Sequence, residues 1–350
     1  MKDYIFKKKV QGLTMTIFKN SMTIFSQLII FIGMTLSSIL HATPISATAQ
    51  SAQLQTKGAV HDIVLLKDNK HALASSYQEG ILYLDISKPL QPHVLSVFSA
   101  TKNAESLVVS KNEQLAYIAN GSAGVDIIDI SKPTAMKLIH RFDTPSYTFG
   151  VALSPDEKIL YVADNTTGVM IFDVSNPAKP KQLAGIRSKA GSANVTLSEN
   201  GKVLFIADQS NGVVIINVSN PAKPQYISRI KASGQAQNVT LSRSKQGLYV
   251  ADNNGGVNIY DISHLNKPRR IGHIKTRNAF GITLSNDEKT AYIADLFQGI
   301  HIVDISNPTK TRILQSIKTE RAAEQITLSS DQKTLFIADD QKGIKVITLR

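Results

Sequence analysis

Apolar residues along this chain form short runs that repeat at a nearly constant interval. Each copy has a glycine followed by a run of the form V-x-I-x-D, and successive glycines are 44, 44, 44, 44, 43 and 44 residues apart. The seven glycines are Gly80, Gly124, Gly168, Gly212, Gly256, Gly299 and Gly343. Because propeller blades of four strands recur roughly every 40 to 50 residues, the interval predicts seven blades.

Each copy predicts four short antiparallel strands, named A to D in chain order. In the third copy we expect them over residues 148–154, 159–163, 169–174 and 183–187, separated by polar segments rich in turn-forming residues. Strand C is apolar on both faces, because Val169 and Ile171 alternate with Met170 and Phe172. Both faces must therefore be covered, as they are in a blade that lies between two neighbouring blades.

The two ends of the repeat array complement each other. The seventh copy reaches Arg350 at the end of strand C, and a strand-like segment, residues 51–56, precedes the first copy. This segment supplies the missing strand D if the ring closes, and closure removes the exposed sheet edges. We therefore predict an all-β fold over residues 50–350: one closed seven-bladed β-propeller with four antiparallel strands per blade, the last blade completed by the N-terminal strand.

Residues 1–49 predict an export signal. Lysines precede an uncharged apolar run over residues 24–40, and small residues follow it. This order is typical of a secretory signal peptide, with cleavage expected near residue 42 or 49. An uncleaved membrane anchor is the alternative, because the run is long enough to span a bilayer. We expect an exported bacterial protein that is periplasmic, secreted or on the cell surface, with membrane contact only through this segment if it stays uncleaved.

The run G-[VI]-x-I-x-D-[IV]-S-[NK]-P-x-x-P resembles the LVIVD-repeat family of bacterial and archaeal propellers. Residues 168–180 and 212–224 match it best, while residues 124–133, 256–268 and 299–308 match more loosely. The preceding segment LSPDEKILYVAD is similar to the related YVTN surface-layer propellers. The resemblance implies the propeller fold and an exported or cell-surface protein, and it carries little information on function. Lactonases share the seven-bladed form, but their catalytic residues find no counterpart in this sequence.

Composition excludes several kinds of chemistry. The chain has no cysteine, which excludes thiolate metal sites and cysteine nucleophiles. It also has no G-x-S-x-G elbow, phosphate-binding loop, H-E-x-x-H motif or dinucleotide glycine motif. We therefore predict no cofactor. The formal net charge is +12, and this excess is compatible with anionic partners.

Six of the seven D–A loops carry basic residues. A closed ring would place them around one rim, where weak attractions to an anionic ligand add together. The alternative is ordinary solvated charge on surface loops. We expect a monomer that binds a protein or an anionic surface or glycan, and no nucleic acid, because no aromatic residues alternate with the lysines. The predicted rim consists of Lys57, Lys102, Lys189, Lys231, Lys275, Arg277, Lys318 and Arg321.

Strand A lines the central channel of a propeller, and the seventh, first and second blades are neighbours in the ring. We therefore expect His61, Asp62, Glu105 and Glu324 to lie together at the channel mouth. A histidine among carboxylates could bind a divalent metal or transfer protons. The alternative is a hydrated polar funnel with no chemical role.

Two sets of recurrent aspartates have structural interpretations. Those that end strand C, such as Asp173, are each followed closely by a serine, and we interpret them as turn caps. Those that open the B–C loops, such as Asp164 and Asp252, are expected to form Asx turns that close the hairpin, because the ligand spacing of a calcium loop is missing.

We predict a non-catalytic, exported or cell-surface binding or interaction scaffold that takes an anionic ligand on the face of the D–A and B–C loops. The alternative is a propeller hydrolase, lactonase-like or metal-dependent, with its site at the mouth of the central channel.

Overall fold

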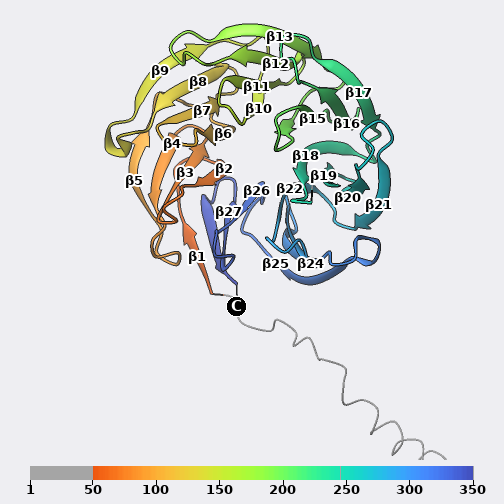
Figure 1. Ribbon diagram of the computed structural model, residues 1–350. Helices are drawn as coiled ribbons and strands as arrows, with labels where there is room; N and C mark the ends of the chain where they lie inside the picture. The colour runs from red at the N-terminus through yellow and green to blue at the C-terminus, as the bar shows by residue number, and fades with distance from the viewer. Residues whose placement is uncertain (1–49, 245, 350) are drawn as a thin grey trace, which may run out of the picture. The chain divides into compact units, whose positions relative to one another are not determined.

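The computed structural model describes residues 50–244 and 246–349. They form seven four-stranded antiparallel sheets arranged as the blades of a ring (Figure 1), and residues of the innermost strands line a cavity at its centre. Strand A is innermost and strand D outermost in each sheet. The predicted fold class is confirmed. The export signal predicted over residues 1–49 lies outside the described residues.

The strands follow the repeat of the sequence. Blades 1 to 4 are β2 Val60–Leu65, β3 His71–Ser76, β4 Gly80–Asp85, β5 His93–Phe98; β6 Ser106–Val109, β7 Leu115–Ala119, β8 Val125–Asp129, β9 Lys137–Phe142; β10 Thr148–Leu153, β11 Ile159–Asp164, β12 Gly168–Asp173, β13 Lys181–Arg187; and β14 Asn194–Leu197, β15 Val203–Ala207, β16 Val213–Asn217, β17 Gln225–Ile230. Blades 5 to 7 are β18 Gln235–Leu241, β19 Gly247–Asn253, β20 Gly256–Asp261, β21 Arg269–Ile274; β22 Ala279–Leu284, β23 Thr290–Asp295, β24 Gly299–Asp304, β25 Arg312–Ile317; and β26 Gln325–Leu328, β27 Thr334–Ala338, β28 Ile344–Thr348 with β1 Ser51–Leu54. Two 3₁₀ turns, η1 Pro133–Ala135 and η2 Pro308–Lys310, lie in C–D connections.

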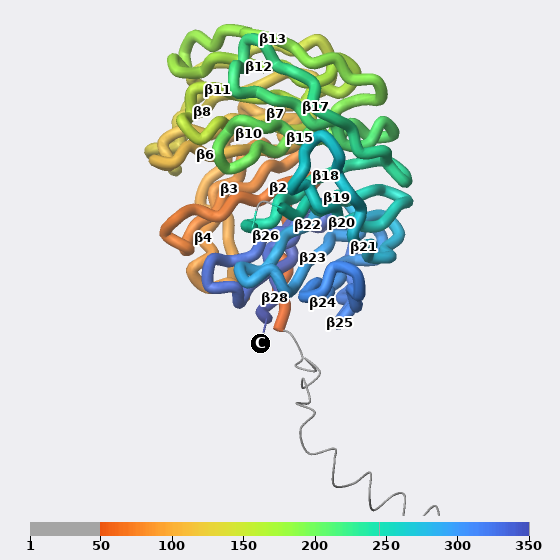
Figure 2. Tube along the Cα trace, turned by 45° about the vertical axis from the view of Figure 1, so that its right-hand side comes forward, coloured from red at the N-terminus to blue at the C-terminus, as the bar shows by residue number. Residues whose placement is uncertain are grey.

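The first strand of the chain completes the last blade. β1 pairs antiparallel with β28 in a continuous register that runs from Ser51 opposite Ile347 to Leu54 opposite Ile344. The two strands lie side by side in Figure 2. Gln53 Nε2 also donates to the carbonyl oxygen of Lys342 at 2.7 Å. The predicted closure of the ring is therefore confirmed.

The hydrophobic core lies between adjacent blades. In one cluster, Phe205 and Ile215 of blade 4 pack with Val239, Leu248 and Val250 of blade 5. All five side chains are at most 3% exposed. Each central strand contributes to a cluster on either side, and this is why strands B and C are apolar on both faces.

The recurrent glycine that precedes strand C has a backbone requirement. At Gly168 φ is +108°, and a Cβ atom there would lie 2.1 Å from the carbonyl oxygen of Ile186 in strand D. Any other residue would be strained and would clash with backbone. Positive φ recurs at all seven positions: Gly80, Gly124, Gly168, Gly212, Gly256, Gly299 and Gly343.

The aspartates that end strand C cap the following turn, as predicted. The backbone N–H of Ser175 donates to Asp173 Oδ1 at 2.9 Å. Hydrogen bonds from the hydroxyl and the backbone of Ser175 lower the pKa of Asp173. The same backbone contact, from the residue two positions on, is made by Asp85, Asp129, Asp261 and Asp304.

Candidate functional site

Four titratable side chains line the mouth of the central channel, where the sequence predicts them. His61 and Asp62 are in β2, Glu105 comes just before β6, and Glu324 comes just before β26. All four line one cavity of about 260 Å³ together with polar and apolar residues of other A strands. The cluster forms because blades 7, 1 and 2 are neighbours in the closed ring.

His61 and Glu324 form an ion pair. His61 Nδ1 lies 2.5 Å from Glu324 Oε2, and both side chains are 18% exposed. Burial acts to lower the pKa of His61, but the hydrogen bond to Glu324 and the charges of Glu324, Glu105 and Asp340 outweigh it and raise that pKa to about 9. The imidazole is therefore protonated at neutral pH.

Glu105 has a partner that the sequence analysis missed. The hydroxyl of Tyr147 donates to Glu105 Oε1. Burial raises the pKa of Glu105, while the charge of His61 and the hydrogen bond from Tyr147 act in the opposite direction. Tyr147 belongs to the D–A loop that has no basic residue. This loop therefore contributes a side chain to the cluster of His61, Asp62, Glu105 and Glu324 at the channel mouth, which we call the hub.

Asp62 links two blades. Its Oδ2 accepts hydrogen bonds from Ser106 Oγ at 3.0 Å and from the backbone N–H of Leu107 at 3.2 Å, and its Oδ1 accepts from the N–H of Ile63. Burial raises the pKa of Asp62, and these hydrogen bonds act to lower it. These hydrogen bonds connect β2 to β6, so Asp62 has a structural role between blades 1 and 2.

The described residues contain no group of three or more His, Asp or Glu side chains placed to hold a metal ion. A metal-binding imidazole must be neutral. In this hub Nδ1 of His61 already contacts Glu324, and the ring is protonated at neutral pH. His61 would therefore have to release a proton before it could bind a metal ion.

The predicted basic rim residues are all exposed and all lie in loops that join strand D to the next strand A. The loops run between β1 and β2, β5 and β6, β13 and β14, β17 and β18, β21 and β22, and β25 and β26. Strand direction puts these loops on one face of the ring. The exposed residues are Lys57, Lys102, Lys189, Lys231, Lys275, Arg277, Lys318 and Arg321.

The aspartates at the ends of the B strands hold these same loops in place. Asp252 Oδ2 accepts from the backbone N–H groups of Ser233 and Gly234 at 2.8 and 3.0 Å. The side chain thus fastens the D–A loop, whereas the sequence indicated an Asx turn within the B–C loop. D–A loops are held in the same way, through backbone N–H groups or a serine hydroxyl, by Asp164, Asp208, Asp295 and Asp339.

These five carboxylates are at most 2% exposed. The carboxylates that fasten the D–A loops therefore lie inside the protein, whereas the rim cations face solvent.

A seven-bladed propeller with this repeat defines a class of protein, and comparison with known proteins identifies the family. The LVIVD repeat model matches residues 102–144, 149–185, 191–231, 233–276 and 279–319. These segments cover more than half of the chain, so the chain belongs to the LVIVD-repeat family. No curated protein matches it.

Among solved structures, the chain is similar to the β-propeller domain of Cps50 (Swd1) from Myceliophteria thermophila. The two share 12% sequence identity with a TM-score of 0.72, and the match covers 86% of this chain and all of that one. At this identity the likeness establishes the fold alone. Within the described part of the chain, no helix has the length and apolarity to cross a membrane.

Proposed function

We propose that this protein is a non-catalytic, exported or cell-surface binding scaffold whose D–A and B–C loop face takes an anionic ligand, either a partner protein or a glycan or envelope surface. The observation that carries the proposal is the separation of charge on this face. Eight cations are exposed there, while the five carboxylates that end the B strands are buried under the loops.

Two further acids of this face support the same interpretation, because both are engaged locally. Glu79 Oε2 accepts from the backbone N–H groups of Lys57 and Gly58 at 2.7 and 3.0 Å. Glu320 lies 3.3 Å from Lys342 Nζ. Both carboxylates therefore have partners other than the ammonium groups of Lys57 and Lys318.

The opposite face differs. Its A–B turns also carry lysines, but exposed carboxylates such as Asp68, Asp156, Asp287 and Asp331 lie in the same turns. Exposed ion pairs contribute about 0.2–1 kcal/mol each. Several of them acting on one polyanion add to a useful affinity that falls with salt. On the D–A loop face, most of the exposed cations have no exposed carboxylate beside them. This distinguishes the D–A loop face from the face of the A–B turns.

The test is retention of the purified protein on immobilised heparin, with elution by rising salt. One variant replaces the six rim lysines by glutamine: Lys57, Lys102, Lys189, Lys231, Lys275 and Lys318. The matched control replaces six lysines of the A–B turns: Lys67, Lys111, Lys158, Lys202, Lys289 and Lys333. We expect the rim variant to elute at much lower salt and the control to shift less. Equal shifts, or an unretained native protein, would contradict the proposal.

A hydrolase centred on the hub is the second candidate, favoured by His61, Glu105 and Glu324 meeting in one cavity and by the hydrogen bond from Tyr147 to Glu105. Metal analysis of the purified protein separates the two functions. Stoichiometric metal that disappears on His61→Ala would favour the hydrolase. Absence of metal in both proteins, together with heparin retention, would favour the scaffold.

A further inference from the structure

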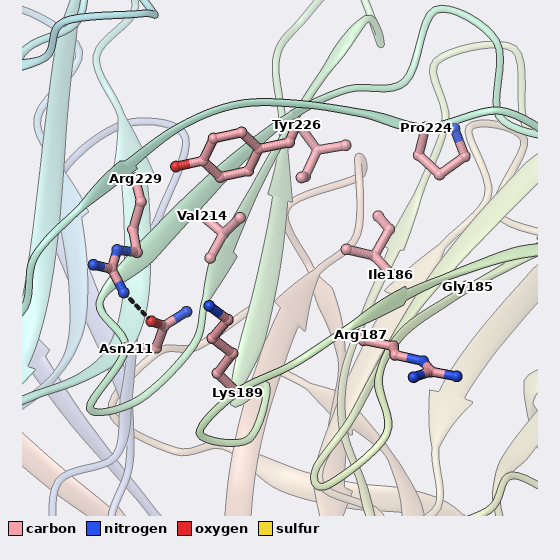
Figure 3. A pocket seen from close by; sticks show the side chains of 10 residues that line it. Gly185, Ile186, Arg187, Lys189, Asn211, Val214, Pro224, Tyr226 and Arg229 are labelled. Atoms are coloured by element: carbon pink, nitrogen blue, oxygen red, sulfur yellow. Dashed lines mark hydrogen bonds between the residues drawn. The ribbon is translucent and has the colours of Figure 1, made fainter.

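A groove of about 520 Å³ lies in the outer wall of the ring between blades 3 and 4 (Figure 3). Its apolar lining comes from Ile186 of β13 and from Val214 and Ile216 of β16. Pro224 and Tyr226 form the side that faces away from the D–A loops. The remaining lining residues are Gly185, Arg187, Lys189, Asn211 and Arg229.

The polar side of the groove is cationic. In Figure 3 the charged ends of Arg229 and Lys189 both lie beside Asn211 at one side of the view, while Arg187 lies at the opposite side. Arg229 Nη1 donates to Asn211 Oδ1, which is a neutral acceptor. No carboxylate lines the groove. Among residues 50–244 and 246–349, no ion pair involves any of these three cations.

Blade 2 shows what compensates an arginine at this position. Arg141 of β9 lies opposite Asp126 of β8, and its Nε and Nη2 donate to the two carboxylate oxygens at 2.6 and 2.7 Å. In blade 4 the corresponding pair is Arg229 opposite Val214. A valine replaces the carboxylate, and the guanidinium of Arg229 is left with uncompensated charge at the edge of an apolar surface.

Two further residues open the groove and give it an aromatic wall. Gly185 occupies in blade 3 the position of Arg141 and Arg229, and a Cβ atom there would contact only the carbonyl oxygen of Val169, at 3.9 Å. No side chain therefore covers the groove from the position of Gly185. Tyr226 is 66% exposed. The residues in register with Tyr226 in other blades are not aromatic: Val94, Leu138, Gln182, Arg270 and Ile313.

We propose that this groove binds a small organic anion with an aromatic body, such as an aryl carboxylate or sulfonate. Lys189 and Arg229 hold the anionic group, and Val214 and Tyr226 contact the ring. The volume lies within the range of about 300–1,000 Å³ that is usual for small-molecule pockets. Guanidinium groups bind pairs of oxygen atoms of carboxylates and of tetrahedral oxyanions through parallel hydrogen bonds, and tyrosine offers a rigid apolar face. This site goes beyond the proposed rim function and shares only Lys189 with it.

The probe is 8-anilinonaphthalene-1-sulfonate, titrated into the native protein and followed by its fluorescence. We expect saturable binding at one site. Charged hydrogen bonds contribute about 1.5–3 kcal/mol, so Arg229→Gln and Lys189→Gln should each weaken binding about tenfold or more. Tyr226→Ala should also weaken it. The matched control, Lys310→Gln, removes an exposed lysine of η2 and should leave binding unchanged.

Competition defines the ligand class. We expect 2-naphthoate to displace the probe and the neutral 2-naphthamide to displace it far less at the same concentration. Binding that is equal in the native protein, Arg229→Gln and Lys189→Gln would place the probe on another apolar surface and overturn the proposal, provided that urea unfolding shows the variants folded. Heparin retention is measured separately, and we expect Arg229→Gln to leave it almost unchanged. The probe titration therefore tests the groove proposal, and heparin retention tests the proposed rim function, independently of each other.

Discussion

Blades 2 and 4 carry an arginine at the same position of strand D, and the two side chains do different things. Arg141 is held by Asp126 and also donates to the carbonyl oxygen of Ala100 at 2.9 Å. Among the described residues, the side chain of Arg229 donates only to the side-chain oxygen of Asn211. The difference depends on the residue that lies opposite each arginine in strand C. The buried carboxylate of Asp126 fixes Arg141 in the structure, whereas Val214 leaves Arg229 available to bind a ligand.

The largest effect should come from removing the shared acceptor of blade 2. Asp126 is fully buried and also accepts from Thr101 Oγ1 and Asn120 Nδ2. Asp126→Ala leaves these donors and Arg141 without a partner, and we expect a loss of about 4 kcal/mol in the free energy of unfolding. Urea unfolding measures it. Val214→Ala in blade 4 is the matched change and should cost about 1 kcal/mol. Equal losses of stability in the two variants would contradict the structural role that distinguishes Asp126 from Val214.

The hub holds another paired cation, His61, whose contribution to stability depends on pH. The pKa of His61 is raised from 6.5 to about 9. The resulting stability is fully present below pH 6.5 and is lost as pH rises through 9. We expect the native protein to lose about 3 kcal/mol at most over this interval relative to His61→Gln. Unfolding curves at several pH values check this, and parallel pH profiles of the two proteins would show that the pair contributes nothing.

Replacing the two arginines directly should give a smaller contrast. Arg141→Gln leaves Asp126 with its remaining donors, and we expect about 2 kcal/mol of destabilisation because a buried carboxylate loses its counter-ion. Arg229→Gln should change stability by about 0.5 kcal/mol or less, as is usual for surface changes. The comparison fails if Arg229→Gln destabilises as much as Arg141→Gln.

A small effect on stability is also expected when the residue opposite Arg229 in blade 4 is made the same as the residue opposite Arg141 in blade 2. Val214→Asp places a carboxylate opposite Arg229. Because Val214 is only half-buried, the new pair should change the free energy of unfolding by about 1 kcal/mol or less. The same variant should abolish binding of the sulfonate probe, since Arg229 is then neutralised. Val214→Asn controls for shape, and probe binding that survives Val214→Asp would mean that Arg229 does not hold the anion.

The parts of the molecule that follow from periodicity could be predicted from the sequence. The recurrent glycine and the strands with two apolar faces indicate the blades, and ring order brings His61, Glu105 and Glu324 together. The basic rim follows in the same way, because loop position in the repeat determines the face.

Contacts that depend on a departure from the repeat could not be predicted. Tyr147 reaches Glu105 from a loop of blade 3, and nothing in its spacing indicates the direction of its side chain. The pair of Arg141 and Asp126 lies beside a register shift between β8 and β9, so strand spacing alone does not show that the two residues are opposite. The groove depends on Gly185, whose signal is the absence of a side chain.

The pairing of β1 with β28 has a consequence for how the molecule is assembled. Gln53 and Lys342, which are in contact in the finished ring, are 289 residues apart in the chain. Such distant contacts make folding slow, and here the final one has to wait until the seventh repeat has been synthesised. Before β1 pairs with it, the completed β28 has a free edge that could accept the leading strand of another copy. Crowding during synthesis would therefore favour domain-swapped chains over isolated rings.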